Sequence, residues 1–77
     1  MEISVAQIKE LIKDGKTSDG KFKLKTKTDT VHIDGTSTNC DYFDIMVTHK
    51  RITYWCCVHV RDLEGSEDKT LNMIKWN

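Results

Sequence analysis

Two neighbouring segments in which apolar and polar residues alternate constrain the fold of this chain most. They run from Tyr42 to Thr48 and from Thr53 to Arg61, are rich in aromatic and β-branched residues, and are separated by the short stretch HKRI. Alternation with a period of two residues is typical of a strand whose two faces differ in environment. The two segments therefore predict an antiparallel hairpin with one apolar face and one mixed face.

The register of this hairpin follows from the need to bring apolar side chains together. This pairing places Val47 opposite Tyr54, Ile45 opposite Cys56 and Phe43 opposite Val58. Ile52 and Val60 extend the same face. On the mixed face, Met46 lies opposite Trp55, Asp44 opposite Cys57 and Tyr42 opposite His59. The turn lacks the Asn or Gly that two-residue loops favour, so a four-residue loop is an equal alternative.

The N-terminal stretch EISVAQIKELIKDG carries the signals of a helix start and a helix end. Ser4 is placed as the N-cap, Gln7 completes a capping box, and Gly15 stands where a left-handed C-cap is favoured. The apolar positions recur at helical spacing and form one stripe, made of Val5, Ile8, Leu11 and Ile12. This stripe needs a cover, which the apolar face of the hairpin can supply.

A lysine-rich segment between the helix and the hairpin has the alternation of a further strand. Its basic positions are Lys21, Lys23, Lys25 and Lys27, and between them stand Phe22, Leu24 and Thr26. Lysines about 7 Å apart on one face can follow the phosphates of a nucleic acid strand. The alternative is an edge strand that uses lysines to prevent aggregation. Since the apolar positions then change from even to odd numbers, we expect a turn or bulge near Thr28 and Asp29.

The C-terminal segment EGSEDKTLNMIKWN has two interpretations. Ser66 followed by Glu67 and Asp68 is typical of a helix start and favours a helix, whereas Thr70 to Trp76 is short enough to pair as a strand. The chain is therefore predicted to be α+β, with an N-terminal helix packed on a mainly antiparallel sheet of three to four strands and a short C-terminal helix or strand. Its 77 residues suffice for a single small domain, 1–77.

The composition argues against several classes of protein. Twelve Lys and Arg balance twelve Asp and Glu, so no net charge attracts nucleic acid or anionic membranes, and no apolar run is long enough to span a bilayer. Three cysteines and an N-terminal end without a secretory signal favour the reducing cytoplasm. Neither a phosphate-binding glycine loop nor a dinucleotide fingerprint occurs, so no cofactor is expected.

Asp44, Cys57 and His59 fall together on the mixed face and allow two reactive interpretations. All three residue types bind zinc, but a tetrahedral site needs a fourth ligand and the spacing matches no paired motif. A cysteine nucleophile with a histidine base is the second interpretation, but a flat strand offers neither a pocket nor oxyanion donors. An ordinary structural role is the simpler explanation, so we expect neither a metal site nor an enzyme.

The mixed face is the predicted functional surface, because Trp, Tyr and Met are favoured at the centres of protein interfaces. The residues expected to bind a partner are Tyr42, Met46, Trp55 and His59. We expect a non-enzymatic protein-binding module with a protein partner, and a second copy of the chain is a further candidate. Small phage or mobile-element products that inhibit or adapt a host protein are of this size and character.

The leading alternative is a domain that binds single-stranded nucleic acid through the lysine strand and an aromatic platform. The protein-binding hypothesis requires the mixed face to stay open. If Leu71, Ile74 and Trp76 pack on it, the face becomes a second small core instead.

Overall fold

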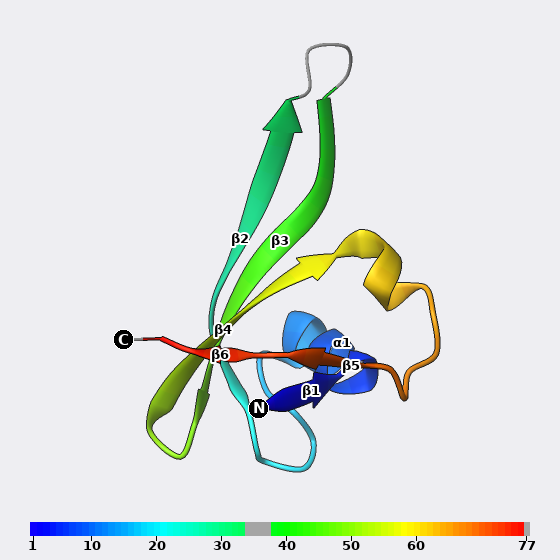
Figure 1. Cartoon of the computed structure of the whole chain (residues 1–77). Coiled ribbons are helices and arrows are strands. Elements are labelled where there is room, and N and C mark those ends of the chain that lie inside the picture. Colours follow the sequence, from blue (N-terminus) through cyan, green and yellow to red (C-terminus); the bar gives the residue numbers. More distant parts are fainter. Residues whose placement is uncertain (34–37, 77) are drawn as a thin grey trace.

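Residues 1–33 and 38–76, which the computed structural model describes, form one α-helix, one short 3₁₀ helix and two antiparallel sheets (Figure 1). Side chains are described for residues 1–29 and 42–76. The elements follow in the order β1 (Glu2–Ser4), α1 (Val5–Asp14), β2 (Lys23–Ile33), β3 (Thr38–His49), β4 (Ile52–His59), η1 (Val60–Leu63), β5 (Thr70–Asn72) and β6 (Ile74–Lys75). The larger sheet has the strand order β2-β3-β4-β6, and β1 pairs with β5 in the smaller one. The predicted α+β class is confirmed.

The helix α1 begins and ends where the sequence predicts. The Ser4 hydroxyl accepts from the Gln7 backbone N–H at 3.1 Å, and the Gln7 side chain accepts from the Ser4 N–H at 3.0 Å. Gly15 ends the helix in the left-handed region with φ 76°, which glycine adopts without steric cost. The buried stripe is narrower than predicted, because Ile12 remains 40% exposed.

The hairpin of β3 and β4 has the predicted register over its whole length, from the pair His49–Ile52 to the pair Tyr42–His59. Only Lys50 and Arg51 connect the strands, both with positive φ, 51° and 67°, so the four-residue alternative is wrong. The prediction for Val60 is also wrong, because β4 ends at His59 and Val60 is 41% exposed in η1. Asp62 ends the strand by accepting the His59 backbone N–H at 3.0 Å.

The hydrophobic core lies between α1, the small sheet and one face of the hairpin. Figure 1 shows α1, β1 and β5 together on one side of β4. The buried cluster consists of residues from every layer, namely Ile3, Ile8, Leu11, Phe22, Phe43, Ile45, Val47, Cys56, Val58 and Met73. The predicted match between the helix stripe and the odd-numbered positions of β3 is therefore confirmed.

A bulge in β2 divides the lysines that the sequence places on one face. Leu24 pairs with Val47 but Thr26 pairs with Met46, so Lys25 is an extra residue in the ladder. Lys27 consequently pairs with Ile45 on the core side of the sheet, where its ammonium lies 4.8 Å from the centre of the Phe43 ring. The strand is irregular at two places, at Lys25 and again between Thr30 and His32, just after the position near Thr28 and Asp29 where the sequence predicts it. Lys27 does not share a face with Lys23.

The C-terminal segment is extended, so the favoured helix is wrong. Leu71 pairs with Ile3, and Met73, two residues on, is 2% exposed, so burial alternates with the period of a strand. The apparent helix start at Ser66 caps a turn instead, in which the Ser66 hydroxyl accepts the Asp68 N–H at 3.3 Å and its carbonyl accepts the Lys69 N–H at 3.1 Å. The Lys69 carbonyl in turn accepts the Val5 N–H at the start of α1, at 2.8 Å.

Candidate functional site

The side of the larger sheet that faces away from the core carries all four predicted partner-binding residues. Residues paired directly across an antiparallel ladder share a face, so the register defines this outer face. It consists of Lys23, Thr26, Thr28, Tyr42, Asp44, Met46, Thr48, Thr53, Trp55, Cys57, His59 and Ile74, and of Trp76 at the end of β6. Among these residues only Lys23 and Asp44 carry a full charge at neutral pH.

An apolar row crosses the middle of the outer face. Met46 pairs with Trp55, and Trp55 pairs with Ile74 on the edge strand β6. Met46 and Trp55 are half-buried and lie outside the core cluster, while Ile74 is 55% exposed. Trp76 follows Ile74 by two residues, donates its backbone N–H to the Thr53 carbonyl at 2.9 Å and is 56% exposed.

The C-terminal strand extends the outer face and does not cover it. Leu71 packs against the core from the other side, whereas Ile74 and Trp76 lie beside Trp55 with more than half of their surface exposed. The sequence condition under which this face would become a second core is therefore not met. Ile74 and Trp76 are candidate contact residues that sequence reasoning missed, because it favoured a helix in this segment.

Tyr42 and His59 meet at the far end of the outer face. Their rings are 4.5 Å apart and meet edge-on at 88°. His59 Nδ1 accepts the Arg61 backbone N–H at 3.1 Å, which ties the imidazole to the start of η1. Tyr42 remains 37% exposed, so this pair adds an aromatic surface to the same face as Met46 and Trp55.

The reactive trio of Asp44, Cys57 and His59 is only partly assembled. Asp44 and Cys57 are paired across the ladder, but the contacts described for His59 are with Tyr42 and the backbone of η1. Partial desolvation, followed by the charge and hydrogen bond of Asp44, raises the pKa of the Cys57 thiol, whereas an activated nucleophile needs a lowered pKa. Within residues 1–29 and 42–76, no three His, Cys, Asp or Glu side chains gather as metal ligands would.

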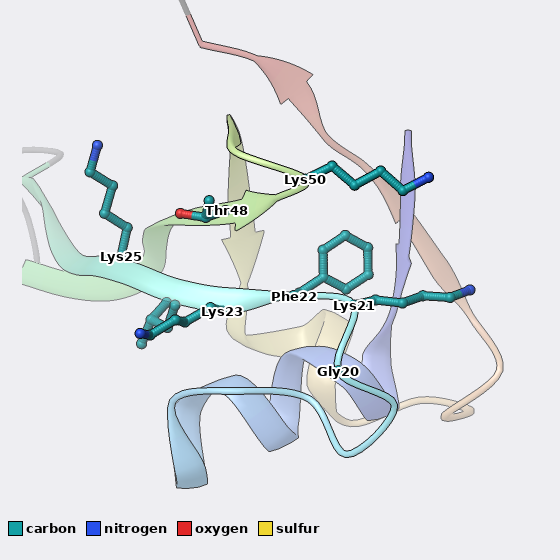
Figure 2. Close-up of a pocket in the computed structure, with 8 residues that line it drawn as sticks. Gly20, Lys21, Phe22, Lys23, Lys25, Thr48 and Lys50 are labelled. Atoms are coloured by element: carbon teal, nitrogen blue, oxygen red, sulfur yellow. The ribbon is translucent and has the colours of Figure 1, made fainter.

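Four lysines line a shallow groove where β2 begins and β3 ends (Figure 2). Lys21, Lys23 and Lys25 come from the β2 side and Lys50 comes from the turn, with a volume of about 590 Å³ between them. We call this hollow the lysine groove. Figure 2 shows Lys21 and Lys50 running in the same direction while Lys25 points another way, so the lysines do not form one straight row.

The positive charge of the lysine groove is only partly offset within the described part of the chain, because the Asp19 carboxylate interacts with the charge of Lys21. No acidic side chain lines it, and its lysines form no salt bridge with a described carboxylate. Lys27, by contrast, is paired with Asp29 at 2.8 Å, and Lys9 and Lys69 are paired as well. Sequence reasoning found three of the groove lysines but missed Lys50, because only the two-residue turn brings it beside β2.

Across residues 1–33 and 38–76, no helix has the length and apolar character required to cross a membrane. Comparison with known protein families, with curated proteins and with solved structures finds no match to this chain.

Proposed function

We propose that this chain is a non-enzymatic module that binds a protein partner through the outer face of its larger sheet. The observation that carries the proposal is the apolar row of Met46, Trp55 and Ile74, which the fold leaves open to solvent at its β6 end. An exposed apolar patch of this kind marks an interaction site in a small protein. Trp76 and the pair of Tyr42 and His59 enlarge the patch on either side.

The chemistry of the outer face favours protein over nucleic acid. Its centre holds threonines and apolar side chains, and the residues of the central row carry no charge. Protein interfaces combine apolar cores with few charges in this way, whereas nucleic acid platforms place cations beside the aromatic rings. The fitting partner surface is thus apolar and weakly charged where it meets Trp55.

Single-stranded nucleic acid is the second candidate, and the lysine groove is the observation that favours it. Lys23, however, is separated from Trp76 by the strands that carry Thr48 and Thr53, three strand spacings or about 14 Å. Because one sugar joins each base to its phosphate, a cation that neutralises this phosphate must lie near the stacked ring. The distance argues against a single nucleotide using both features.

A small phage or mobile-element product that inhibits or adapts a host protein in the cytoplasm is the biological setting we propose. The features that support it are the short chain, the balanced charge and the two described thiols, Cys56 and Cys57, neither of which is in a disulfide. A second copy of the chain is the competing occupant of the outer face.

The test is capture of partners from a host lysate treated with nuclease, at low and high salt, by four forms of the chain. These are the wild type, Trp55→Ala, Ile74→Ser and the matched control Ile12→Ser, which changes an isoleucine of comparable exposure on α1. We expect a single protein that stays bound at high salt, is lost with Trp55→Ala and Ile74→Ser, and is kept with Ile12→Ser. An apolar contact weakens little with salt, unlike a phosphate contact.

Two results would contradict the proposal. Recovery of nucleic acid in untreated lysate that disappears with salt, and with Lys23→Glu and Lys25→Glu, would favour the second candidate. Equal loss of the captured protein in the Ile12→Ser control would show that the outer face is not the contact surface.

A further inference from the structure

We infer that the lysine groove binds an acidic polypeptide segment of the protein that occupies the outer face. The inference rests on the proposed function for the identity of the partner. The basic side chains of the groove come from β2 and from the turn after β3, and Phe22 and Thr48 also line it. Lys21 and Lys50 run in the same direction and Lys25 in another (Figure 2).

The backbone on the β2 side of the groove is held in place before any ligand arrives. The Lys21 N–H donates to Asp19 at 2.9 Å, and His49 Nδ1 donates to the Lys21 carbonyl at 2.8 Å. The neighbouring Phe22 N–H donates to the buried Thr17 hydroxyl at 3.1 Å. A backbone fixed in this way loses little entropy when the groove is filled, which favours binding.

The opposite wall is built by an unusual turn. Lys50 and Arg51 both have positive φ, at positions where two-residue hairpin loops favour Asn and Gly. Two cationic side chains are thus kept in a conformation that other residues adopt more easily. Backbone strain that persists in a fold is a pointer to function, and here it places Lys50 at the mouth of the groove.

The charge of the groove selects the ligand. The chain has no net charge, yet four lysines and no acidic residue line the groove. Exposed ammonium groups in a hollow raise the local concentration of anions and steer their approach. Lys23 belongs to both the groove and the outer face, so one protein can occupy the two surfaces together.

An acidic peptide suits this geometry better than a nucleic acid strand. The bulge at Lys25 sends Lys27 to the core side, so the lysines do not form one track along β2. The two tryptophans that would stack bases, Trp55 and Trp76, lie on β4 and at the end of β6, which do not pair with β2. A short run of Asp and Glu has flexible side chains and needs no regular track of cations.

The test measures binding of a fluorescent peptide of ten glutamates to the whole chain by anisotropy at low salt, with a ten-nucleotide oligothymidylate as the comparison. The groove variant carries Lys23→Gln, Lys25→Gln and Lys50→Gln. The matched control carries Lys9→Gln, Lys13→Gln and Lys69→Gln, which removes the same charge elsewhere. Amide chemical shifts recorded with the peptide locate its binding site.

We expect the groove variant to bind the peptide about tenfold more weakly and the control to bind it about as well as the wild type, since each exposed charge contributes modestly. Shift changes should cluster at Gly20 to Lys25, Thr48 and Lys50. No binding at millimolar peptide, or equal loss in the control, would overturn the inference. So would oligothymidylate binding tenfold or more tighter through the same lysines, which would assign the groove to nucleic acid.

The two proposals can fail separately. Trp55→Ala should leave glutamate peptide binding unchanged, because Trp55 does not line the groove. A failed peptide experiment therefore removes the groove inference and leaves the outer-face proposal to be judged by Trp55 and Ile74.

Discussion

Ile45 and Met46 are neighbours in β3 that serve opposite surfaces. Ile45 is fully buried beneath α1, whereas Met46 is half-buried on the outer face beside Trp55. The same holds one strand away, where Cys56 is in the core and Cys57 is exposed. In this hairpin one residue therefore stabilises the core, while its neighbour lies on the face for which we propose binding.

Replacing each of the two neighbours in β3 tests this separation. Ile45→Ala leaves a cavity in the core and should lower the free energy of unfolding by about 2 to 5 kcal/mol. Met46→Ala removes a side chain from the surface and should cost about 1 kcal/mol or less. Denaturant titration of both variants measures the difference, and a harmless Ile45→Ala beside a severe Met46→Ala would mean that the faces are reversed.

The Cys57 thiol should react slowly at neutral pH. Desolvation and Asp44 raise its pKa above the ordinary 9.0, and burial raises the pKa of Cys56 to about 11. In a Cys40→Ser background, the rate of thiol modification should rise with a midpoint above pH 9.0, and Asp44→Asn should lower that midpoint. A midpoint well below this value would revive the interpretation of Cys57 as an activated nucleophile.

Asp19 should give the fold a measurable dependence on acid pH. The Thr17 hydroxyl at 2.6 Å, followed by the Lys21 N–H, lowers the pKa of this carboxyl from 3.8. Its ionised form therefore stabilises the fold above the unfolded pKa, and that contribution is lost as pH falls through the lower folded pKa.

The comparison with Asp19→Asn isolates this contribution. Wild type should be the more stable at pH 7, and the difference between the two unfolding midpoints should shrink below about pH 4. A difference that stays constant down to pH 2.5 would show that the Asp19 charge does not act in this way.

At the scale of elements, the sequence predicts α1 and the β3–β4 hairpin well because each carries local signals. Ser4, Gln7 and Gly15 define the helix, and the two-residue alternation defines the hairpin faces. The bulge at Lys25 has no such signal, since only pairing with β3 shows which residue of β2 is extra. Strand β5 depends on a partner at the other end of the chain, so the local resemblance of Ser66 to a helix cap was misleading.

The turn between β3 and β4 should become more stable with the residues that such turns favour. Changing Lys50 to Asn and Arg51 to Gly relieves two positive φ angles and should raise the free energy of unfolding by about 1 kcal/mol. The control Lys50→Gln with Arg51→Gln removes the same charges and keeps the strain, so it should stay within about 0.5 kcal/mol of wild type. Equal effects in both variants, measured by thermal or chemical unfolding, would attribute the change to charge.

In the whole molecule the positive and negative charges balance, but charged and apolar side chains are distributed unevenly over the surface. The sequence predicts Tyr42, Met46, Trp55 and His59 on one face, and their shared face follows from strand parity alone. It does not reveal Ile74, Trp76 or Lys50, because their positions depend on β6 pairing with β4 and on the length of a turn. The candidate site is therefore predicted at its centre and completed at its edges only by the tertiary structure.

The most direct test of binding through the outer face is photo-cross-linking with p-benzoylphenylalanine placed at one position at a time. The positions of Trp55 and Ile74 test the outer face. The positions of Ile12 and Lys13, whose side chains are exposed on α1, are the controls. We expect positions 55 and 74 to cross-link to the same host protein and positions 12 and 13 to give no such cross-link. Cross-links to that protein from positions 12 and 13 alone, or only to a second copy of the chain from positions 55 and 74, would contradict this expectation.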